Sequence, residues 1–368
     1  MNMMMKKTAL ALAMGLALGL SACGGGGGGG SSGDSASSDL CKNIDGVQSV
    51  LDMGMTRDSN GACKIYGVDP AVADVFKKAG TNPLAYPFLD LVNAEYAYAR
   101  GLNGAGVTVA VWDYGISTTH REFVGGKIVH PATIPIDGDH GTMVASMASG
   151  WTIGVANQAT LFDLHGTNLA APYSLNGAAV FNMSLGGNDF SWIFPNVPDN
   201  VLFVQSAGNE GITIDERRAR GVTVVPYDSM VLAPRFVYAG VVWINDPDSP
   251  PMGNFPGDSA LLQSTFITVP AYGAIVADTT SDTAYVQMGG TSMAAPAISG
   301  AGAIIKQARP DLNAAQIRDI LLKSANKSFS VEYQRNDCGA KKTTNCGLYY
   351  YGQGLLDIAA ALKLAGVN

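Results

Sequence analysis

The sequence is poor in charged residues and has no long run of lysine or arginine. Of its 368 residues only 14% are charged, and 30 acidic residues outnumber 23 basic ones, for a net charge of -7. Nucleic-acid-binding surfaces need clustered basic residues, so nucleic acid is not an expected partner. The longest apolar run near the start, Thr8 to Leu20, spans 13 residues and is too short to cross a bilayer as a helix. No later segment is longer and equally apolar, and no internal repeat is visible.

The short apolar run has the surroundings of a secretory signal. Lys6 and Lys7 precede it, and Leu20-Ser21-Ala22-Cys23 follows it. These are the parts of a signal peptide over residues 1–22. A cysteine directly after the cleavage site resembles the lipobox of bacterial lipoproteins, which implies lipid, including palmitate, on Cys23. The alternative is a plain secretory signal followed by a chance cysteine.

Glycine and serine dominate the residues after Cys23. Residues 23–39 therefore read as a lipidated cysteine and a flexible linker with a reach of about 20 Å. We expect the mature protein in the bacterial cell envelope, anchored to the lipid bilayer. Gly24 after the cysteine favours the outer membrane, by resemblance to other lipoproteins. Residues 40–90 follow as an N-terminal extension or a short prodomain, and residues 91–368 form the main domain.

Four cysteines remain besides Cys23, and an exported protein is expected to pair them. Three pairings are possible. Proximity in the sequence favours Cys41–Cys63 and Cys338–Cys346. The cysteines lack CxxC spacing and nearby histidines, so we expect no metal site there.

Short apolar runs alternate with helical patterns beyond residue 91. Runs at 106–113, 178–182 and 201–205 are typical of buried parallel strands. Helical patterns cover 70–78, 140–149, 292 to about 307, a stretch that begins after Asp311 or Asn313, and 355–364. The sequence therefore predicts an α/β fold with a mostly parallel central sheet.

One serine stands where a nucleophile could be activated. Gly289-Gly290-Thr291-Ser292 opens a predicted helix, whose positive N-terminal end favours developing negative charge. A serine hydroxyl also needs a base, a group that orients the base, and donors for the oxyanion. Among four histidines, His140 lies at a predicted helix start, and Asp113 ends a predicted strand. We interpret His120, His130 and His165 as structural.

Glycine and proline positions refine this expectation. Gly141 after His140 allows another segment to approach closely. Gly289 and Gly290 remove Cβ atoms that would hinder the substrate. Pro296 has no N–H for the carbonyl of Ser292, so we expect a distorted first turn in that helix. Gly300 and Gly302 would let the helix pack closely.

Five stretches, in this order, resemble the signature blocks of subtilisin-like serine peptidases. They are Val109-Ala-Val-Trp-Asp113-Tyr-Gly-Ile116, His140-Gly-Thr-Met-Val-Ala145, Asn182-Met-Ser-Leu-Gly-Gly187, Ala207-Gly-Asn209-Glu-Gly211 and Gly290-Thr-Ser292-Met-Ala-Ala-Pro296. The resemblance implies a three-layer fold with helices on both faces of the sheet. It makes Ser292 the nucleophile, His140 the base, Asp113 its orienting group and Asn209 an oxyanion donor. It also implies a substrate-binding strand at Ser184, Leu185, Gly186 and Gly187.

The resemblance implies a serine endopeptidase that cleaves protein or peptide substrates through an acyl-enzyme. We expect a monomer that needs no cofactor for its chemistry; structural calcium is common in this family, but the sequence names no ligands for it. Residues 93–101 and the glycine-rich start resemble passengers of subtilase-type autotransporters, although we expect no β-barrel after the peptidase domain. Two alternatives are an inactive surface binding protein on this scaffold and an esterase of the α/β-hydrolase type. The esterase is disfavoured because it requires Gly-x-Ser-x-Gly and the order Ser, Asp, His.

Overall fold

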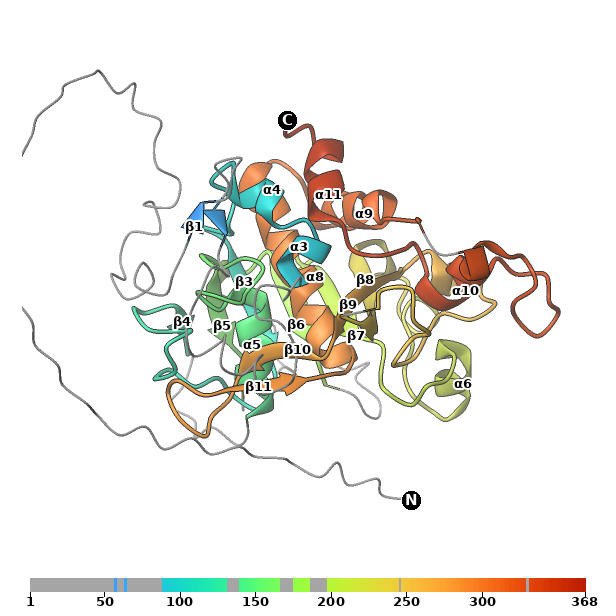
Figure 1. Ribbon diagram of the computed structural model, residues 1–368, viewed down its shortest axis with the longest axis horizontal. Helices are drawn as coiled ribbons and strands as arrows, with labels where there is room; N and C mark the ends of the chain where they lie inside the picture. Colours follow the sequence, from blue (N-terminus) through green and yellow to red (C-terminus); the bar gives the residue numbers. More distant parts are fainter. Residues whose placement is uncertain are drawn as a thin grey trace, which may run out of the picture. The chain divides into compact units, whose positions relative to one another are not determined.

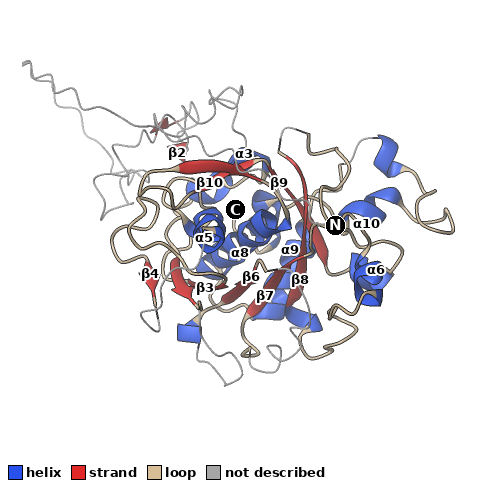
Figure 2. Ribbon diagram, turned by 90° about the horizontal axis from the view of Figure 1, so that it is seen from below, coloured by secondary structure: helices blue, strands red, loops and turns tan. Residues whose placement is uncertain are grey.

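Parallel strands form the central sheet of the molecule (Figure 1, Figure 2). The computed structural model describes residues 56–57, 63–64, 88–130, 139–165, 175–185, 197–244, 246–328 and 331–368, all within one unit that spans Leu40–Asn368. Within these residues the sheet has seven strands in the order β4-β5-β3-β6-β7-β8-β9, and every pair of neighbours is parallel. Their bounds are β3 (Thr108–Trp112), β4 (Ile128–Val129), β5 (Thr160–Asp163), β6 (Val180–Met183), β7 (Leu202–Ser206), β8 (Phe236–Trp243) and β9 (Phe266–Tyr272).

Two antiparallel pairs lie outside this sheet. Strands β10 (Ala274–Ala277) and β11 (Tyr285–Met288) form one hairpin, and β1 (Thr56–Arg57) pairs with β2 (Cys63–Lys64). The described helices are α3 (Phe88–Leu91), α4 (Glu95–Tyr98), α5 (His140–Ser149), η2 (Leu175–Gly177), α6 (Ile214–Ala219), η4 (Ala233–Arg235), α7 (Ala260–Gln263), α8 (Thr291–Ala308), α9 (Ala314–Ser324), η5 (Val331–Gln334), α10 (Cys346–Tyr351) and α11 (Ile358–Leu364).

Side chains of each strand alternate between the two faces of the sheet, as the pleat requires. On one face, Val180 and Leu202 join the core that α5 and α8 cover, and α8 crosses the middle of the sheet (Figure 1). Gly300 and Gly302 allow this close packing, as predicted. A Cβ atom on Gly300 would lie 2.7 Å from the Cβ of Val155, and one on Gly302 would lie 2.7 Å from Leu202.

The opposite face carries a row of aromatic rings. Phe181 stacks on Phe203 with centroids 4.9 Å apart, and Phe203 stacks on Phe236 at 5.5 Å. These three residues are direct register partners on β6, β7 and β8. Side chains from η2, α6 and α7 join the same core. Helices therefore cover both faces, and the predicted three-layer α/β fold is confirmed.

Most predicted elements agree with the structure to within a few residues. The predicted helix at 140–149 is α5, and the helix predicted from Ser292 is α8, which runs through Pro296 without a break. Of the two starting points proposed for α9, Asn313 is the N-cap. The helix predicted at 70–78 lies outside the described residues.

The described part of the chain contains one disulfide, Cys338–Cys346, as predicted. Cys41 lies outside the described residues, so its pairing with Cys63 stays a prediction. Among the described helices, none combines the length and apolar character that a membrane span would need.

Candidate active site

Asp113 and His140 meet at the carboxyl edge of the sheet. Asp113 directly follows β3, and His140 is the first residue of α5. The Nδ1 of His140 lies 2.7 Å from Oδ1 of Asp113, whose carboxylate is buried. A Cβ atom on Gly141 would collide with the carbonyl of Gly115, so the glycine after His140 permits this approach, as predicted.

The Asp113 carboxylate determines where the His140 proton resides. A carboxylate can only accept, so Nδ1 must carry the hydrogen and Nε2 is left as an acceptor. Burial lowers the pKa of His140, but the hydrogen bond and charge of Asp113, with the charge of Asp139, raise it above its ordinary value. A neutral His140 with a free Nε2 lone pair is what a general base requires.

Ser292 is the second residue of α8, and its hydroxyl bonds to the end of β6. Ser292 Oγ donates to the carbonyl of Ser184 at 2.9 Å. No hydrogen bond joins Ser292 to His140 in the described part of the chain. Nucleophile–base hydrogen bonds are often long before substrate binds, so the geometry is compatible with a resting state.

Ser184 also explains how α8 accommodates a proline. Pro296 leaves the carbonyl of Ser292 without its helical partner, and Ser184 Oγ donates to that carbonyl at 2.9 Å. Asn182 donates to Ser184 Oγ at 3.0 Å, and Ser299 donates to Asn182 Oδ1 at 3.0 Å. The first turn of α8 is thus tied to β6 and keeps its helical form, contrary to the distortion we expected.

Asn209 follows β7 and faces the start of α8. Its Oδ1 accepts from the N–H of Thr291 at 2.9 Å and from Thr291 Oγ1 at 3.1 Å. Because the N–H of Thr291 can only donate, the Asn209 atom that it contacts must be the oxygen Oδ1. The nitrogen Nδ2 makes neither of these two hydrogen bonds. A Cβ atom on Gly290 would lie 3.2 Å from this Nδ2. Asn209 therefore presents an N–H donor beside the residue that precedes Thr291 and Ser292.

Gly289 has a packing contact that the sequence did not predict, while its expected role toward the substrate stays a prediction. A Cβ atom there would lie 2.7 Å from a ring carbon of Tyr272. Gly289 therefore serves packing against that ring. Gly290, with φ 122°, takes a backbone conformation that favours glycine.

Two residues that hold the Asn209 turn were given no role in the sequence analysis. Thr291 is fully buried, and its Oγ1 also accepts from the N–H of Gly208 at 3.0 Å. Asn254 is fully buried as well: Nδ2 donates to Ala207 O at 2.9 Å, and Oδ1 accepts from Glu210 N at 3.1 Å. No sequence pattern marks Asn254, because it lies 45 residues away from Asn209 along the chain.

The predicted substrate strand is described only in part. Ser184 is buried against Ser292, and Leu185 is half-buried. Gly186 and Gly187 lie outside the described residues, so their role stays a prediction.

The remaining histidines have structural contacts. Buried His120 has Nε2 at 2.9 Å from Ala284 O. His130 Nδ1 lies 3.1 Å from Asp163, and His165 Nδ1 lies 3.2 Å from the carbonyl of Asp113. Of the four histidines, only His140 contacts the carboxylate of Asp113.

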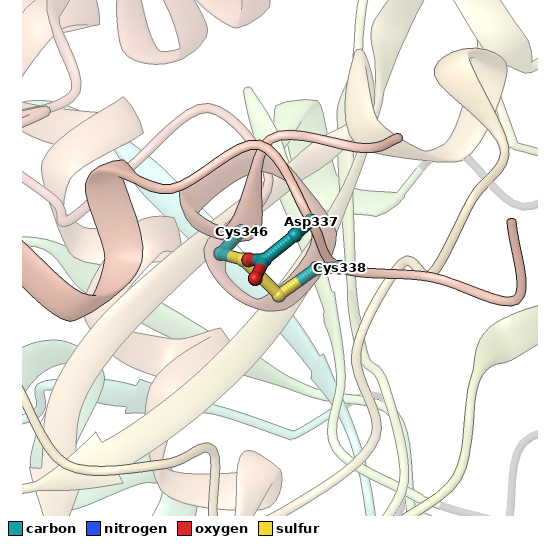
Figure 3. Close-up of side chains that lie close together, drawn as sticks. All are labelled: Asp337, Cys338 and Cys346. Atoms are coloured by element: carbon teal, nitrogen blue, oxygen red, sulfur yellow. A yellow bond between two sulfur atoms is a disulfide. The ribbon is translucent and has the colours of Figure 1, made fainter. Parts of the chain in front are cut away.

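One group of potential metal ligands occurs in the described part of the chain. Asp337, Cys338 and Cys346 place one ligand atom each within 4.8 Å of the others (Figure 3). Both sulfurs form the disulfide, so they are not thiolates that could bind a metal. This group does not fit the structural calcium that the family resemblance suggests, because calcium takes oxygen ligands.

Comparison with known proteins identifies the family of the chain. Residues 104–345 match the subtilase family, Peptidase S8. The chain is 30% identical over 312 residues to subtilisin DY of Bacillus licheniformis, which covers 77% of this chain and 100% of the relative. It is 28% identical over 327 residues to subtilisin E of Bacillus subtilis (strain 168), which covers 80% of this chain and 76% of the relative.

Two solved structures share the fold. The prenylagaramide maturation protease PagA superposes with a TM-score of 0.52 at 20% identity, covering 73% of this chain and 98% of that one. A cold-adapted subtilisin-like serine proteinase superposes with a TM-score of 0.50 at 23% identity, covering 70% of this chain and 90% of that one. At these identities the likeness concerns the fold alone.

Proposed function

Because this chain belongs to the subtilase family of subtilisin-like serine endopeptidases, we propose that Ser292, His140 and Asp113 are its catalytic triad. The observation that carries the proposal is the 2.7 Å contact between His140 Nδ1 and the buried Asp113 carboxylate. This contact leaves Nε2 as the free acceptor on the ring. Asp, His, Ser is also the order in which subtilisin presents its own triad, so the order is inherited from that family.

The first step is the attack of Ser292 Oγ on the scissile carbonyl carbon. For this, Oγ rotates away from the carbonyl of Ser184 and donates to His140 Nε2. The Oγ proton passes to Nε2 as the Oγ–C bond forms, and the imidazolium is stabilised by Asp113. Exchange of one hydrogen bond for another makes this rotation cost little.

Two donors favour the negative charge that then forms on the carbonyl oxygen. Asn209 Nδ2 is one, held in orientation by the two hydrogen bonds from Thr291 to its Oδ1. The Ser292 N–H is the other, at the positive end of the 18-residue helix α8. Both are fixed before substrate arrives, so no reorganisation is needed.

Collapse of the tetrahedral intermediate breaks the C–N bond. His140 returns its proton to the leaving amine, and the acyl group stays on Ser292 Oγ as an ester. Water, activated by His140 in the same way, then hydrolyses the ester and restores the serine. No cofactor takes part in these steps.

Substitution of Ser292 by alanine tests the proposal. We expect Ser292→Ala to fold and melt as the unmodified protein does and to lose hydrolysis of an unfolded protein substrate. Ser264→Ala removes an exposed serine whose hydroxyl bonds only to the nearby carbonyl of Leu261; it is the control, and we expect it to keep hydrolysis. Undiminished turnover by a folded Ser292→Ala variant would rule out Ser292 as the nucleophile. A folded, unmodified protein without any hydrolysis would favour the binding-protein alternative.

We also propose that the protein is exported and anchored to the bacterial outer membrane through lipid on Cys23. The support is the Leu20-Ser21-Ala22-Cys23 stretch after a signal-like segment. Cells that produce the full chain are expected to incorporate labelled palmitate into it, and Cys23→Ser to abolish the label. Equal labelling of both forms would contradict the anchor.

A further inference from the structure

A charged side chain lies buried beside the proposed oxyanion donor and lacks a hydrogen bond that burial demands. Arg217, on α6, is 2% exposed. Its Nε is buried without a hydrogen-bond partner. The nearest opposite charge, Glu210 Oε2, lies 3.8 Å from Nε, beyond hydrogen-bond length. A buried charge in this state is costly unless a partner completes it.

Arg235, a similarly buried guanidinium, shows what a structural arginine looks like in this molecule. It is 4% exposed, and its nitrogens donate to the carbonyls of Pro198 at 2.8 Å, Val201 at 3.0 Å and Val197 at 2.9 Å. The guanidinium of Arg235 therefore has backbone acceptors for its buried donors and holds the segment around residues 197–201 in place. Arg217 is as buried, but its buried Nε has no acceptor, which indicates a ligand rather than a structural role.

The position of Arg217 connects it to the site. Arg217 comes eight residues after Asn209 along the chain, and its side chain lies beside Gly208, the residue before Asn209. A Cβ atom on Gly208 would lie 2.5 Å from Asn254 Nδ2, 2.5 Å from Glu210 Oε2 and 3.1 Å from Arg217 Nε. The three polar groups thus converge on the glycine next to Asn209.

Substrate geometry brings one side chain to this point. The carbonyl under attack lies between Ser292 Oγ and Asn209 Nδ2. The side chain of the same residue, the P1 residue, branches from the carbon next to that carbonyl. It must therefore extend past the residues that adjoin Asn209, where Gly208 lies against the polar groups of Asn254, Glu210 and Arg217.

Glu210 supplies the carboxylate nearest to the guanidinium. Its side chain is 46% exposed and is held by Asn254 Nδ2 at 2.5 Å. A half-exposed carboxylate can turn to solvent, and an incoming carboxylate would replace the charge and the acceptor that Arg217 and Asn254 lose. The donors of Arg217 and Asn254 would then face an incoming carboxylate, which a guanidinium binds in a two-pronged arrangement.

We propose that Arg217 is a specificity-determining residue that binds the carboxylate of an acidic P1 side chain, so that the protein cleaves after glutamate or aspartate. The inference rests on the proposed function, because the P1 residue is defined by Ser292 and Asn209. Glu210 acts as a competing carboxylate that the substrate displaces.

Cleavage sites and matched peptides test the proposal together. Digestion of an unfolded protein, with every new end identified, shows whether cuts follow acidic residues. Two peptides that differ only in glutamate or glutamine at P1 then isolate the charge. We expect kcat/KM to favour the glutamate peptide by about 10- to 100-fold. Cuts without acidic preference would overturn the inference and leave the serine peptidase intact; a folded protein that cuts nothing would overturn both.

Variants separate specificity from a merely structural role. Arg217→Gln should bring the two peptides to nearly equal kcat/KM while the glutamine peptide is still cleaved. Arg218→Gln removes the adjacent arginine, which is exposed and bonds Asp228 at 3.0 Å, and should keep the preference. Equal loss on both peptides in Arg217→Gln would mean that Arg217 only supports the Asn209 turn.

Glu210→Gln does not depend on the folding of an Arg217 variant. It removes the competing charge from a half-exposed position, so we expect the preference for glutamate to increase. A decrease in the preference for glutamate would contradict the proposal. If the unmodified protein preferred lysine at P1 and Glu210→Gln abolished that preference, the pocket would be assigned to Glu210, which would also contradict the proposal.

Discussion

Asn209 allows a sharp test, because the structure fixes which end of its amide faces the developing charge. Thr291 holds Oδ1 through two hydrogen bonds, so Nδ2 is the atom available to the oxyanion. Asn209→Ala removes the donor and should lower kcat by about 100- to 1000-fold, a magnitude taken from subtilisin itself. Asn209→Ala also removes the acceptor of both hydrogen bonds from buried Thr291, a loss of about 1–3 kcal/mol, so the melting temperature should fall and kcat is measured well below it.

Asn209→Asp keeps the anchored oxygen and replaces the donor by an anionic oxygen. Two unit negative charges about 4 Å apart repel by about 4 kcal/mol at an effective dielectric constant of about 20. This corresponds to a further loss of up to about 1000-fold. Asn209→Asp should therefore be less active than Asn209→Ala at pH 8, where the carboxylate is ionised.

The assay is kcat and KM on one peptide for both variants, with melting temperatures measured alongside. Asn313→Asp is the control, because aspartate caps a helix as well as asparagine does and Asn313 caps α9 on the surface. If the kcat of Asn209→Asp equalled or exceeded that of Asn209→Ala, Nδ2 would not face the oxyanion, and the assignment of Asn209 as the donor would be wrong.

Three further changes follow from the structure. The pKa of His140 is raised, and the base must be neutral to act. As the pH is lowered, kcat/KM should therefore fall with a midpoint above about 6.5. A midpoint below about 6.5 would mean that burial outweighs the carboxylates of Asp113 and Asp139. Asp113→Asn removes the two largest causes that raise this pKa, leaving only the charge of Asp139; it should lower kcat by about 10,000-fold, with the residual pH midpoint shifted to lower pH. Cys338→Ser with Cys346→Ser opens a loop with sequence separation 8 and should lower the free energy of unfolding by about 2–3 kcal/mol without changing kcat, as denaturant titration and kinetics would show.

The sequence predicted those elements whose patterns are local. The bounds of α5 were right, because a continuous run of small and apolar side chains precedes Gly150. Asn313 was one of two starts considered for α9. The structure selects it because Asn313 and Gln316 bond each other's backbone N–H, which completes a capping box.

Errors arose where distant segments decide the conformation. The last helix was predicted from Leu355, but Leu355 exchanges backbone hydrogen bonds with Asn326, and α11 begins only after its N-cap, Asp357. The first turn of α8 stays helical because Ser184, from another strand, supplies the bond that Pro296 cannot. No local pattern in either segment announces such a partner.

The same limit applies to the site. The contact between Asp113 and His140 could be anticipated because Asp113 follows the end of β3 and His140 begins α5, and such positions gather at one edge of a parallel sheet. The roles of Thr291, at the start of α8, and Asn254, in a loop, could not be anticipated, because neither residue carries a signal until the fold brings it to Asn209. The unpaired Nε of Arg217 likewise becomes visible only when its burial and its missing acceptor are compared with the bonded guanidinium of Arg235.

The most direct measurement is the mass-spectrometric mapping of a fluorophosphonate adduct on the folded protein. An activated serine with a nearby base and oxyanion donors should carry a single adduct, on Ser292, and His140→Ala should suppress it. An unmodified Ser292 in a protein with normal folding, or an adduct on another serine, would contradict the catalytic triad.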